Sequence, residues 1–214
     1  SHGYAFASGL AATATVLDSL DSGSHVICMD DVYGGTYRLF ERVRKRSANL
    51  EFSFVDLGDR AALEAAVRPN TKLIWAETPT NPLLKVLDIA ALADFARKRG
   101  IRLAVDNTFA TPILQRPLEL GAHLVMHSAT KYLNGHSDLL AGVLVTREDS
   151  ALWQRIRAIR AQIGGTLGSF EFQPVMEEAV QFGLRSWVHQ HALRLGLDLI
   201  TSLELPGRGG LREF

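Results

Sequence analysis

Two side chains with acid–base and nucleophilic chemistry follow neighbouring apolar segments of the sequence. The apolar run 102–105 is followed at once by Asp106, and the run 123–126 is followed shortly by Lys131. Runs of this length are typical of buried strands, and parallel strands end at one edge of a sheet. We therefore expect an acid and an amine to emerge at the same edge. Taken alone, Asp106 fits a helix N-cap or a loop acid equally well.

Lys131 differs from the other lysines in its sequence surroundings. Lys45 and Lys98 lie in Arg-Lys-Arg clusters at predicted helix ends, where cations complement the helix dipole and face water. Lys72 opens a predicted strand, and Lys85 lies in a loop that contains proline. Only Lys131 closely follows a buried run among hydroxyl-bearing and aromatic residues, where desolvation would make its amine nucleophilic at neutral pH. Without other signals, a surface lysine after a strand would explain the same pattern.

Three further segments could bind a ligand at this edge. Residues 8–13 place small side chains at a predicted helix start, where free N–H groups and the helix dipole attract an anion. The segment is not GxGxxG and no acidic ribose partner follows, so a dinucleotide is disfavoured. Tyr33 follows a predicted strand and could stack on a ligand or pack in the fold. Asn81, in the proline-rich loop 77–82, could donate to a ligand or to its own loop.

In combination, these parts match the requirements of pyridoxal 5'-phosphate. The helix start would bind the phosphate, and a lysine forms a Schiff base with the aldehyde. An acid keeps the pyridine nitrogen protonated so that the ring can withdraw electrons, while an aromatic side chain stacks on the ring. Pyridoxal 5'-phosphate is therefore the cofactor that the residues predict.

Several other patterns are weaker. Residues 128–131 match SxxK, but the SDN and KTG elements of penicillin-recognising enzymes are absent from the sequence. His189 and His191 lack a third metal ligand, and we expect no metal site. The triad residue types in 136–138 are adjacent, whereas a catalytic triad is assembled in space. Cys28 lies within a predicted strand and is most simply an inert core thiol.

The elements that would position these residues alternate regularly along the chain. Apolar strand-length runs occupy residues 25–30, 51–56, 72–78, 101–107, 123–128 and 141–146. Helix-like stretches lie at 9–20, 35–46, 60–67, 89–99 and 150–161. Continuous apolar strands separated by helices predict an α/β fold with a mainly parallel sheet covered on both faces. The alternation stops at about residue 164.

Composition narrows the function classes. The 214 residues include 23 Lys+Arg and 23 Asp+Glu, a balance that supplies neither a phosphate track for nucleic acid nor a basic membrane anchor. No uncharged apolar stretch reaches the length of a membrane span. A single cysteine excludes an internal disulfide and favours a reducing, cytoplasmic setting.

The motifs closely resemble those of the Cys/Met-metabolism family of pyridoxal phosphate enzymes. The resemblance is carried by residues 106–109 and 127–138, together with segments 8–12, 33–36 and 77–82 in the family's order and spacing. It covers about residues 1–167. It implies a fold-type I large domain with a seven-stranded, mainly parallel sheet.

The resemblance also implies residue roles. Lys131 would be the Schiff-base lysine and proton carrier, Asp106 would pair with the pyridine nitrogen, and Tyr33 would stack on the ring and help to activate the substrate. The phosphate would be held by backbone N–H groups and hydroxyls, and other contacts would complete the cofactor site. The implied cofactor-binding residues are Gly9, Leu10, Tyr33, Asn81, Asp106, Thr108, Ser128, Thr130 and Lys131. Leu10 stands where the family usually has Met.

The chain ends depart from the family pattern. The resemblance implies a fragment in which residues 1–167 form the cofactor-binding large domain without the family's N-terminal arm. Residues 168–214 would be a divergent helical tail in place of the small C-terminal domain that carries a carboxylate-binding arginine. We therefore expect this chain by itself to be poorly active, because substrate positioning would be lost.

For the activity, the resemblance implies action on a small sulfur amino acid. The leading expectation is γ-elimination of cystathionine to cysteine, α-ketobutyrate and ammonia. Cystathionine γ-synthase or homoserine sulfhydrylase chemistry is the alternative, as is a truncated, inactive fragment. The family's assembly implies a homo-oligomer, a tetramer built as a dimer of dimers, for an intact protein.

Overall fold

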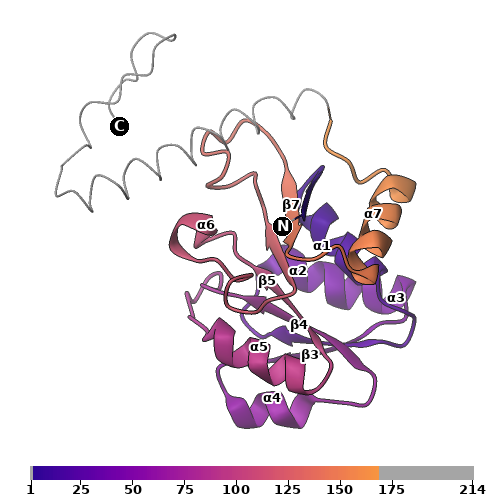
Figure 1. Ribbon diagram of the computed structural model, residues 1–214, viewed down its shortest axis with the longest axis vertical. Coiled ribbons are helices and arrows are strands. Elements are labelled where there is room, and N and C mark those ends of the chain that lie inside the picture. Colours follow the sequence, from indigo (N-terminus) through magenta and orange to yellow (C-terminus); the bar gives the residue numbers. More distant parts are fainter. Residues whose placement is uncertain (1, 169–214) are drawn as a thin grey trace, which may run out of the picture.

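The computed structural model describes residues 2–168, and within them seven strands form one sheet. The strands are β1 (His2–Phe6), β2 (His25–Met29), β3 (Glu51–Val55), β4 (Thr71–Glu77), β5 (Arg102–Asp106), β6 (Leu124–His127) and β7 (Gly142–Thr146). Their spatial order is β1-β7-β6-β5-β4-β2-β3. Figure 1 shows the sheet with β3, β4, β5 and β7 labelled. Strand β7 runs antiparallel to both of its neighbours, and all other pairs are parallel.

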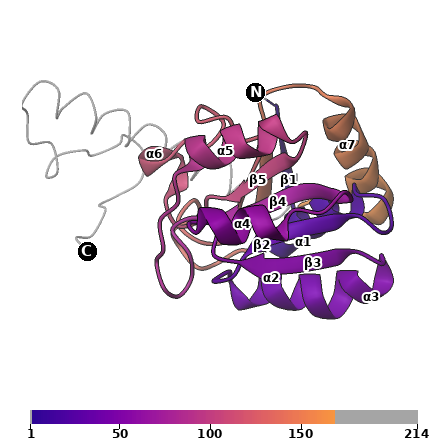
Figure 2. The ribbon, with the colours of Figure 1, turned by 90° about the horizontal axis from the view of Figure 1, so that it is seen from below.

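Helices cover both faces of the sheet. They are α1 (Gly9–Asp18), α2 (Gly34–Arg38), α3 (Lys45–Ser47), α4 (Arg60–Ala66), α5 (Ile89–Lys98), α6 (Thr111–Leu114) and α7 (Ala151–Ile163), with the π-helical segment η1 (Leu39–Arg44) joining α2 to α3. Helix α1 contacts β1, β6 and β7 and also packs against α2, η1 and α7. Figure 2 shows α4 and α5 on the opposite side of the sheet from α2 and α3. No helix in this part of the chain is long and apolar enough to cross a membrane.

Local sequence signals explain where the helices begin. Ser8, Asp59, Asp88 and Ser150 precede α1, α4, α5 and α7, and each side chain accepts a hydrogen bond from a backbone N–H of the first turn. Such caps satisfy donors that the helix itself cannot satisfy. Helix α7 ends at Gly164, whose φ of 69° is left-handed and favours glycine.

The predicted α/β architecture with a mainly parallel sheet is confirmed, and the predicted strands and helices correspond to observed elements within a few residues. The helix predicted at 35–46 is the exception, because it is divided into α2, η1 and α3. Two short elements were not predicted, β1 and α6. The predicted tail beyond residue 168, including His189 and His191, lies outside the described residues.

Strands β2 and β4 lie side by side, and the direction in which the chain adds strands to the sheet changes between them. From β2 the chain continues to β3 on one side, whereas from β4 it continues to β5 on the other side. The loops that leave the carboxyl ends of β2 and β4 therefore diverge. In open α/β sheets, ligands bind in the crevice at such a switch point.

Candidate active site

Asp106 ends β5 and is buried, with only 6% of its surface exposed. Its Oδ1 accepts hydrogen bonds from the Thr108 backbone N–H at 3.0 Å and from the Thr108 hydroxyl at 2.6 Å. Within residues 2–168, no hydrogen bond reaches Oδ2. Burial raises the pKa of Asp106 to about 6, since Thr108 only partly offsets the desolvation. A cationic partner at Oδ2 would favour the carboxylate.

Thr108 joins this acid to the next strand end. Its hydroxyl donates to Asp106 and accepts the Ser128 backbone N–H at 2.9 Å. The end of β5 is thus fixed relative to the turn that follows β6 and contains Lys131. The cofactor role predicted for Thr108 remains a prediction, whereas its hydrogen bonds place it as the link between these two strand ends.

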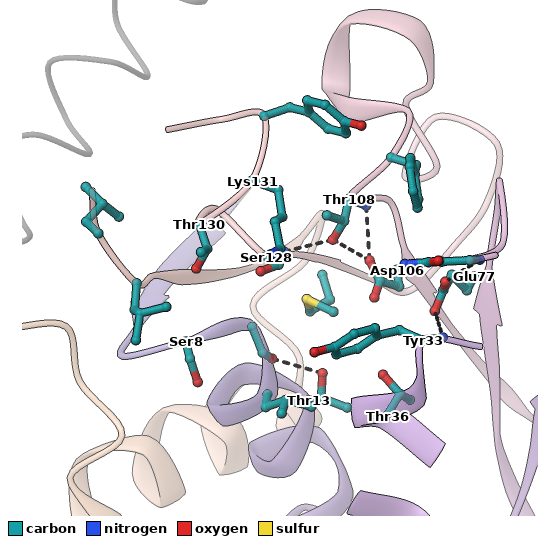
Figure 3. A pocket seen from close by; sticks show the side chains of 18 of the residues that line it. Ser8, Thr13, Tyr33, Thr36, Glu77, Asp106, Thr108, Ser128, Thr130 and Lys131 are labelled. Carbon is teal, nitrogen blue, oxygen red and sulfur yellow. Dashed lines mark hydrogen bonds between the residues drawn. The ribbon is translucent and has the colours of Figure 1, made fainter. Parts of the chain in front are cut away.

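Lys131 lies in that turn, where its backbone N–H donates to the Ser128 carbonyl at 3.1 Å. Figure 3 shows Lys131, Ser128 and Thr108 along one wall of a pocket. Lys131 is an exposed residue within residues 2–168 and lines the pocket. The desolvation expected for its amine stays a prediction.

The start of α1 forms the opposite wall. The Ser8 side chain accepts the Ala11 N–H at 3.1 Å, and the Ala12 N–H donates to the Ser8 carbonyl. Within residues 2–168, no hydrogen bond uses the N–H groups of Gly9 and Leu10, as an anion site requires.

Close backbone approaches fix the position of this helix start. A Cβ on Gly9 would lie 2.8 Å from the Cβ of Ser128, and a Cβ on Gly142 would lie 2.1 Å from the Ser8 carbonyl oxygen. Strand β7 and the Ser128 turn therefore both touch the first turn of α1. The Ser128 side chain is placed beside the predicted phosphate site. The Thr130 hydroxyl also lines the pocket, but it exchanges hydrogen bonds with the backbone of Ala141.

Tyr33 precedes α2 and is 45% exposed. Its side chain extends into the pocket from the side of Glu77 (Figure 3). A Cβ on Gly35 would lie only 2.2 Å from the Tyr33 ring, so the ring rests against a glycine. The half-exposed ring is thus available at the pocket wall to stack on a flat ligand, as the sequence predicts.

Glu77 is a pocket residue to which sequence reasoning gave no role. It ends β4, is 4% exposed, and accepts the backbone N–H groups of Tyr33 and Asn81, each at 2.9 Å. Burial and the charge of Asp106 raise the pKa of Glu77 to about 8. No motif signals this role, because its partners are backbone groups. The only available signal is its position as a strand-end acid in the sequence.

All nine predicted cofactor-binding residues line one cavity of about 1040 Å³. It also includes Ser8, Thr13, Thr36, Glu77, Phe109, Met126, Tyr132 and residues 135 and 137–140. The cavity brings together an amine, a buried carboxyl group, an aromatic ring and two free helix N–H groups. The donor set fits pyridoxal phosphate, because each part of that molecule finds a group of matching chemistry.

The chain belongs to the Cys/Met metabolism PLP-dependent enzyme family, whose model matches residues 1–193. The predicted resemblance to this family is therefore confirmed, and the match extends beyond residue 167, where the recognised motifs end. Pyridoxal phosphate is the cofactor of this family.

The similar proteins are enzymes of cystathionine metabolism. A cystathionine β-lyase from Coxiella burnetii is 50% identical over 91% of this chain and 50% of its own length. A cystathionine γ-lyase from Bacillus subtilis is 49% identical over 96% of this chain and 55% of its own length. The crystal structure of a cystathionine γ-lyase from Lactobacillus plantarum is 45% identical with a TM-score of 0.83, covering 86% of this chain and 48% of that one. The chain spans about half the length of the curated relatives it matches.

Proposed function

We propose that the protein is a pyridoxal phosphate-dependent enzyme that cleaves cystathionine by γ-elimination, releasing cysteine, α-ketobutyrate and ammonia. The observation that supports this function is the convergence of Lys131, Asp106 and Tyr33 in one cavity at the carboxyl edge of the sheet. Relatives named cystathionine γ-lyase that are 46–54% identical to this chain give further support.

Each residue would have a distinct part in holding the cofactor. The Gly9 and Leu10 N–H groups, with the Ser128 hydroxyl, would bind the phosphate. The Thr130 hydroxyl would join them by turning its proton from the Ala141 carbonyl to the phosphate. Asp106 Oδ2 would accept a hydrogen bond from the protonated ring nitrogen, and Asn81 would lie near the phenolic oxygen. Tyr33 would stack on the ring.

The cofactor, when bound, supplies a positively charged ring that withdraws the electron pair left at the substrate Cα. Lys131 Nζ would hold the cofactor covalently before the substrate arrives and would then take the proton from Cα. Asp106 would keep the ring nitrogen protonated throughout. Because Thr108 orients Asp106 and also bonds to the Ser128 backbone, the acid and the lysine turn keep one relative geometry.

A second candidate is γ-replacement, as in cystathionine γ-synthase and homoserine sulfhydrylases. Relatives named cystathionine γ-synthase, 44–48% identical, support this alternative. The two reactions share the same cofactor chemistry, so the residues described above serve both.

The test is to incubate the purified protein with pyridoxal phosphate and cystathionine, at high protein concentration because this chain by itself is expected to be poorly active, and to identify the products. Cysteine and α-ketobutyrate would support γ-elimination, whereas homocysteine and pyruvate would show cleavage on the other side of the sulfur and overturn it. A parallel assay with an activated homoserine ester and cysteine would reveal γ-replacement. Lys131→Ala serves as the inactive control.

We further propose that the protein assembles with copies of itself. The loop after β4 exposes Leu83, Leu84 and Val86, with exposed fractions of 67%, 58% and 73%. Apolar side chains gathered on one exposed loop are typical of an interaction surface. Light scattering would measure the assembly state, and a monomer at micromolar concentration would contradict this proposal.

A further inference from the structure

Glu77 makes two hydrogen bonds that lead to different sides of the candidate site. Its Oε2 accepts the Tyr33 N–H at 2.9 Å, and its Oε1 accepts the Asn81 N–H at the same distance. Tyr33 belongs to the loop after β2, and Asn81 belongs to the loop after β4. These loops diverge from the switch point of the sheet, so one carboxyl group holds both sides of the crevice.

We propose that Glu77 is a positioning residue that holds Tyr33 and Asn81 at the cofactor site through these two backbone hydrogen bonds. The proposal rests on the proposed function, since it assigns the two held residues to cofactor contacts. Glu77 itself takes no proton from the substrate.

The setting of Tyr33 explains why such a restraint is needed. Its side chain is 45% exposed, and its ring lies against Gly35, which has no side chain to hold it. Tyr33 precedes α2 and makes no side-chain cap. Within residues 2–168, Glu77 is the acceptor for its N–H. Holding the backbone at Tyr33 directs the ring into the pocket, although packing encloses only about half of the side chain.

The cost of placing an acid here supports a functional role. Glu77 is buried beside Asp106, its register partner on β5, and both burial and that neighbouring charge disfavour a charged Glu77. The two backbone donors act in the opposite direction. Buried groups held against such a cost cluster at functional sites.

The test is backbone amide hydrogen exchange, measured by NMR on the ¹⁵N-labelled, cofactor-free protein. In the unmodified protein, the Tyr33 and Asn81 amides should exchange slowly. In Glu77→Gln, the side-chain NH₂ can only donate, so at least one backbone N–H loses its acceptor. We expect that amide to exchange about 10-fold faster, the ratio that the loss of one hydrogen bond gives. Unchanged exchange of both amides would overturn the proposal.

Asp106→Asn is the matched control, because Asp106 is the adjacent buried strand-end acid. It should leave the Tyr33 and Asn81 amides protected and alter the Thr108 amide, whose N–H bonds to Asp106. If Glu77→Gln does not fold, amide exchange in the unmodified protein still tests the proposal. Rapid exchange of both the Tyr33 and the Asn81 amides in that protein would overturn it.

A second readout reports on the cofactor geometry. The visible circular dichroism of bound pyridoxal phosphate depends on how the ring is held, and it should fall in Glu77→Gln while the far-ultraviolet spectrum stays unchanged. Unaltered visible dichroism would contradict a role in holding Tyr33 against the ring. Amide exchange in the cofactor-free protein does not depend on the proposed function. Failure of the positioning role of Glu77 can therefore be distinguished from failure of the proposed enzymatic activity.

Discussion

Glu77 and Asp106 are register partners on the parallel strands β4 and β5, so two buried carboxyl groups end side by side at one edge of the sheet. Their hydrogen bonds differ in kind. Asp106 is bonded to Thr108 through one oxygen, whereas both oxygens of Glu77 accept backbone N–H groups. Only Asp106 therefore has an oxygen free of hydrogen bonds within residues 2–168. This difference supports the proposal that Asp106, rather than Glu77, pairs with the ring nitrogen.

Lys131 should be the residue that binds the cofactor covalently. Borohydride reduction of the protein with pyridoxal phosphate, followed by peptide mapping, should place the label on Lys131. Lys131→Arg should abolish this label, while Lys85→Arg should not, because the Lys85 amine is paired with Asp30 and Asp56. A label on Lys72 or Lys85 would contradict the assignment.

Asp106→Asn should weaken catalysis while leaving covalent attachment of the cofactor possible. An amide cannot stabilise a protonated ring nitrogen, so turnover should fall by a factor on the order of 100 or more. The measurement is the rate of α-ketobutyrate formation at saturating cofactor. Near-normal turnover would show that the role given to Asp106 is wrong.

Gly35→Ala should reduce cofactor affinity more than it reduces stability. The new Cβ would lie 2.2 Å from the Tyr33 ring, and the exposed ring can move away more easily than the backbone. Equilibrium titration with pyridoxal phosphate would measure the change. Gly34→Ala is the matched control, since its Cβ would meet only the flexible end of Arg38, at 3.2 Å. Equal affinity in the two variants would refute the prediction.

His25 should make the protein less stable as the pH falls. Its ring bonds to Thr71 and Ser53, and burial lowers the pKa of His25 to about 4. The unfolded chain therefore binds the proton first, near pH 6.5, so stability present above that pH is lost as the pH falls towards 4. Because of His25, the free energy of unfolding should be about 1–2 kcal/mol lower at pH 5 than at pH 7.5.

Urea unfolding of the protein and of His25→Gln at both pH values would measure this contribution. Comparing the two proteins matters because the raised pKa values of Glu77 and Asp106 act in the opposite direction. Their protonated forms favour the fold as the pH falls, in both proteins alike. An identical pH dependence of the two proteins would exclude the role of His25.

Sequence patterns predicted the interior strands well, because β2, β4, β5 and β6 are buried along nearly their whole length and consist of continuous apolar runs. Strand β1 was missed since it lies at the sheet edge, where His2 and Gly3 are exposed. Its pairing with β7 depends on a segment more than a hundred residues away, which local patterns do not reveal.

The residues of the candidate site also differ in how well the sequence predicts them. Lys131, Asp106 and Tyr33 could be predicted because their side-chain chemistry and strand-end positions give a signal in the sequence. Glu77 could not be assigned its role, since it acts on backbone N–H groups that every non-proline residue has.

Gly142 helps to set the size of the predicted anion site, although it lies outside the segment that forms the site. Its Cα passes so close to the Ser8 carbonyl that even a methyl group would push the first turn of α1 away from the sheet. The separation between Gly9 and Ser128, the two sides of the predicted phosphate site, would widen with it. Phosphate affinity is thus expected to be sensitive to side-chain size at a strand residue that has no side chain to offer a ligand.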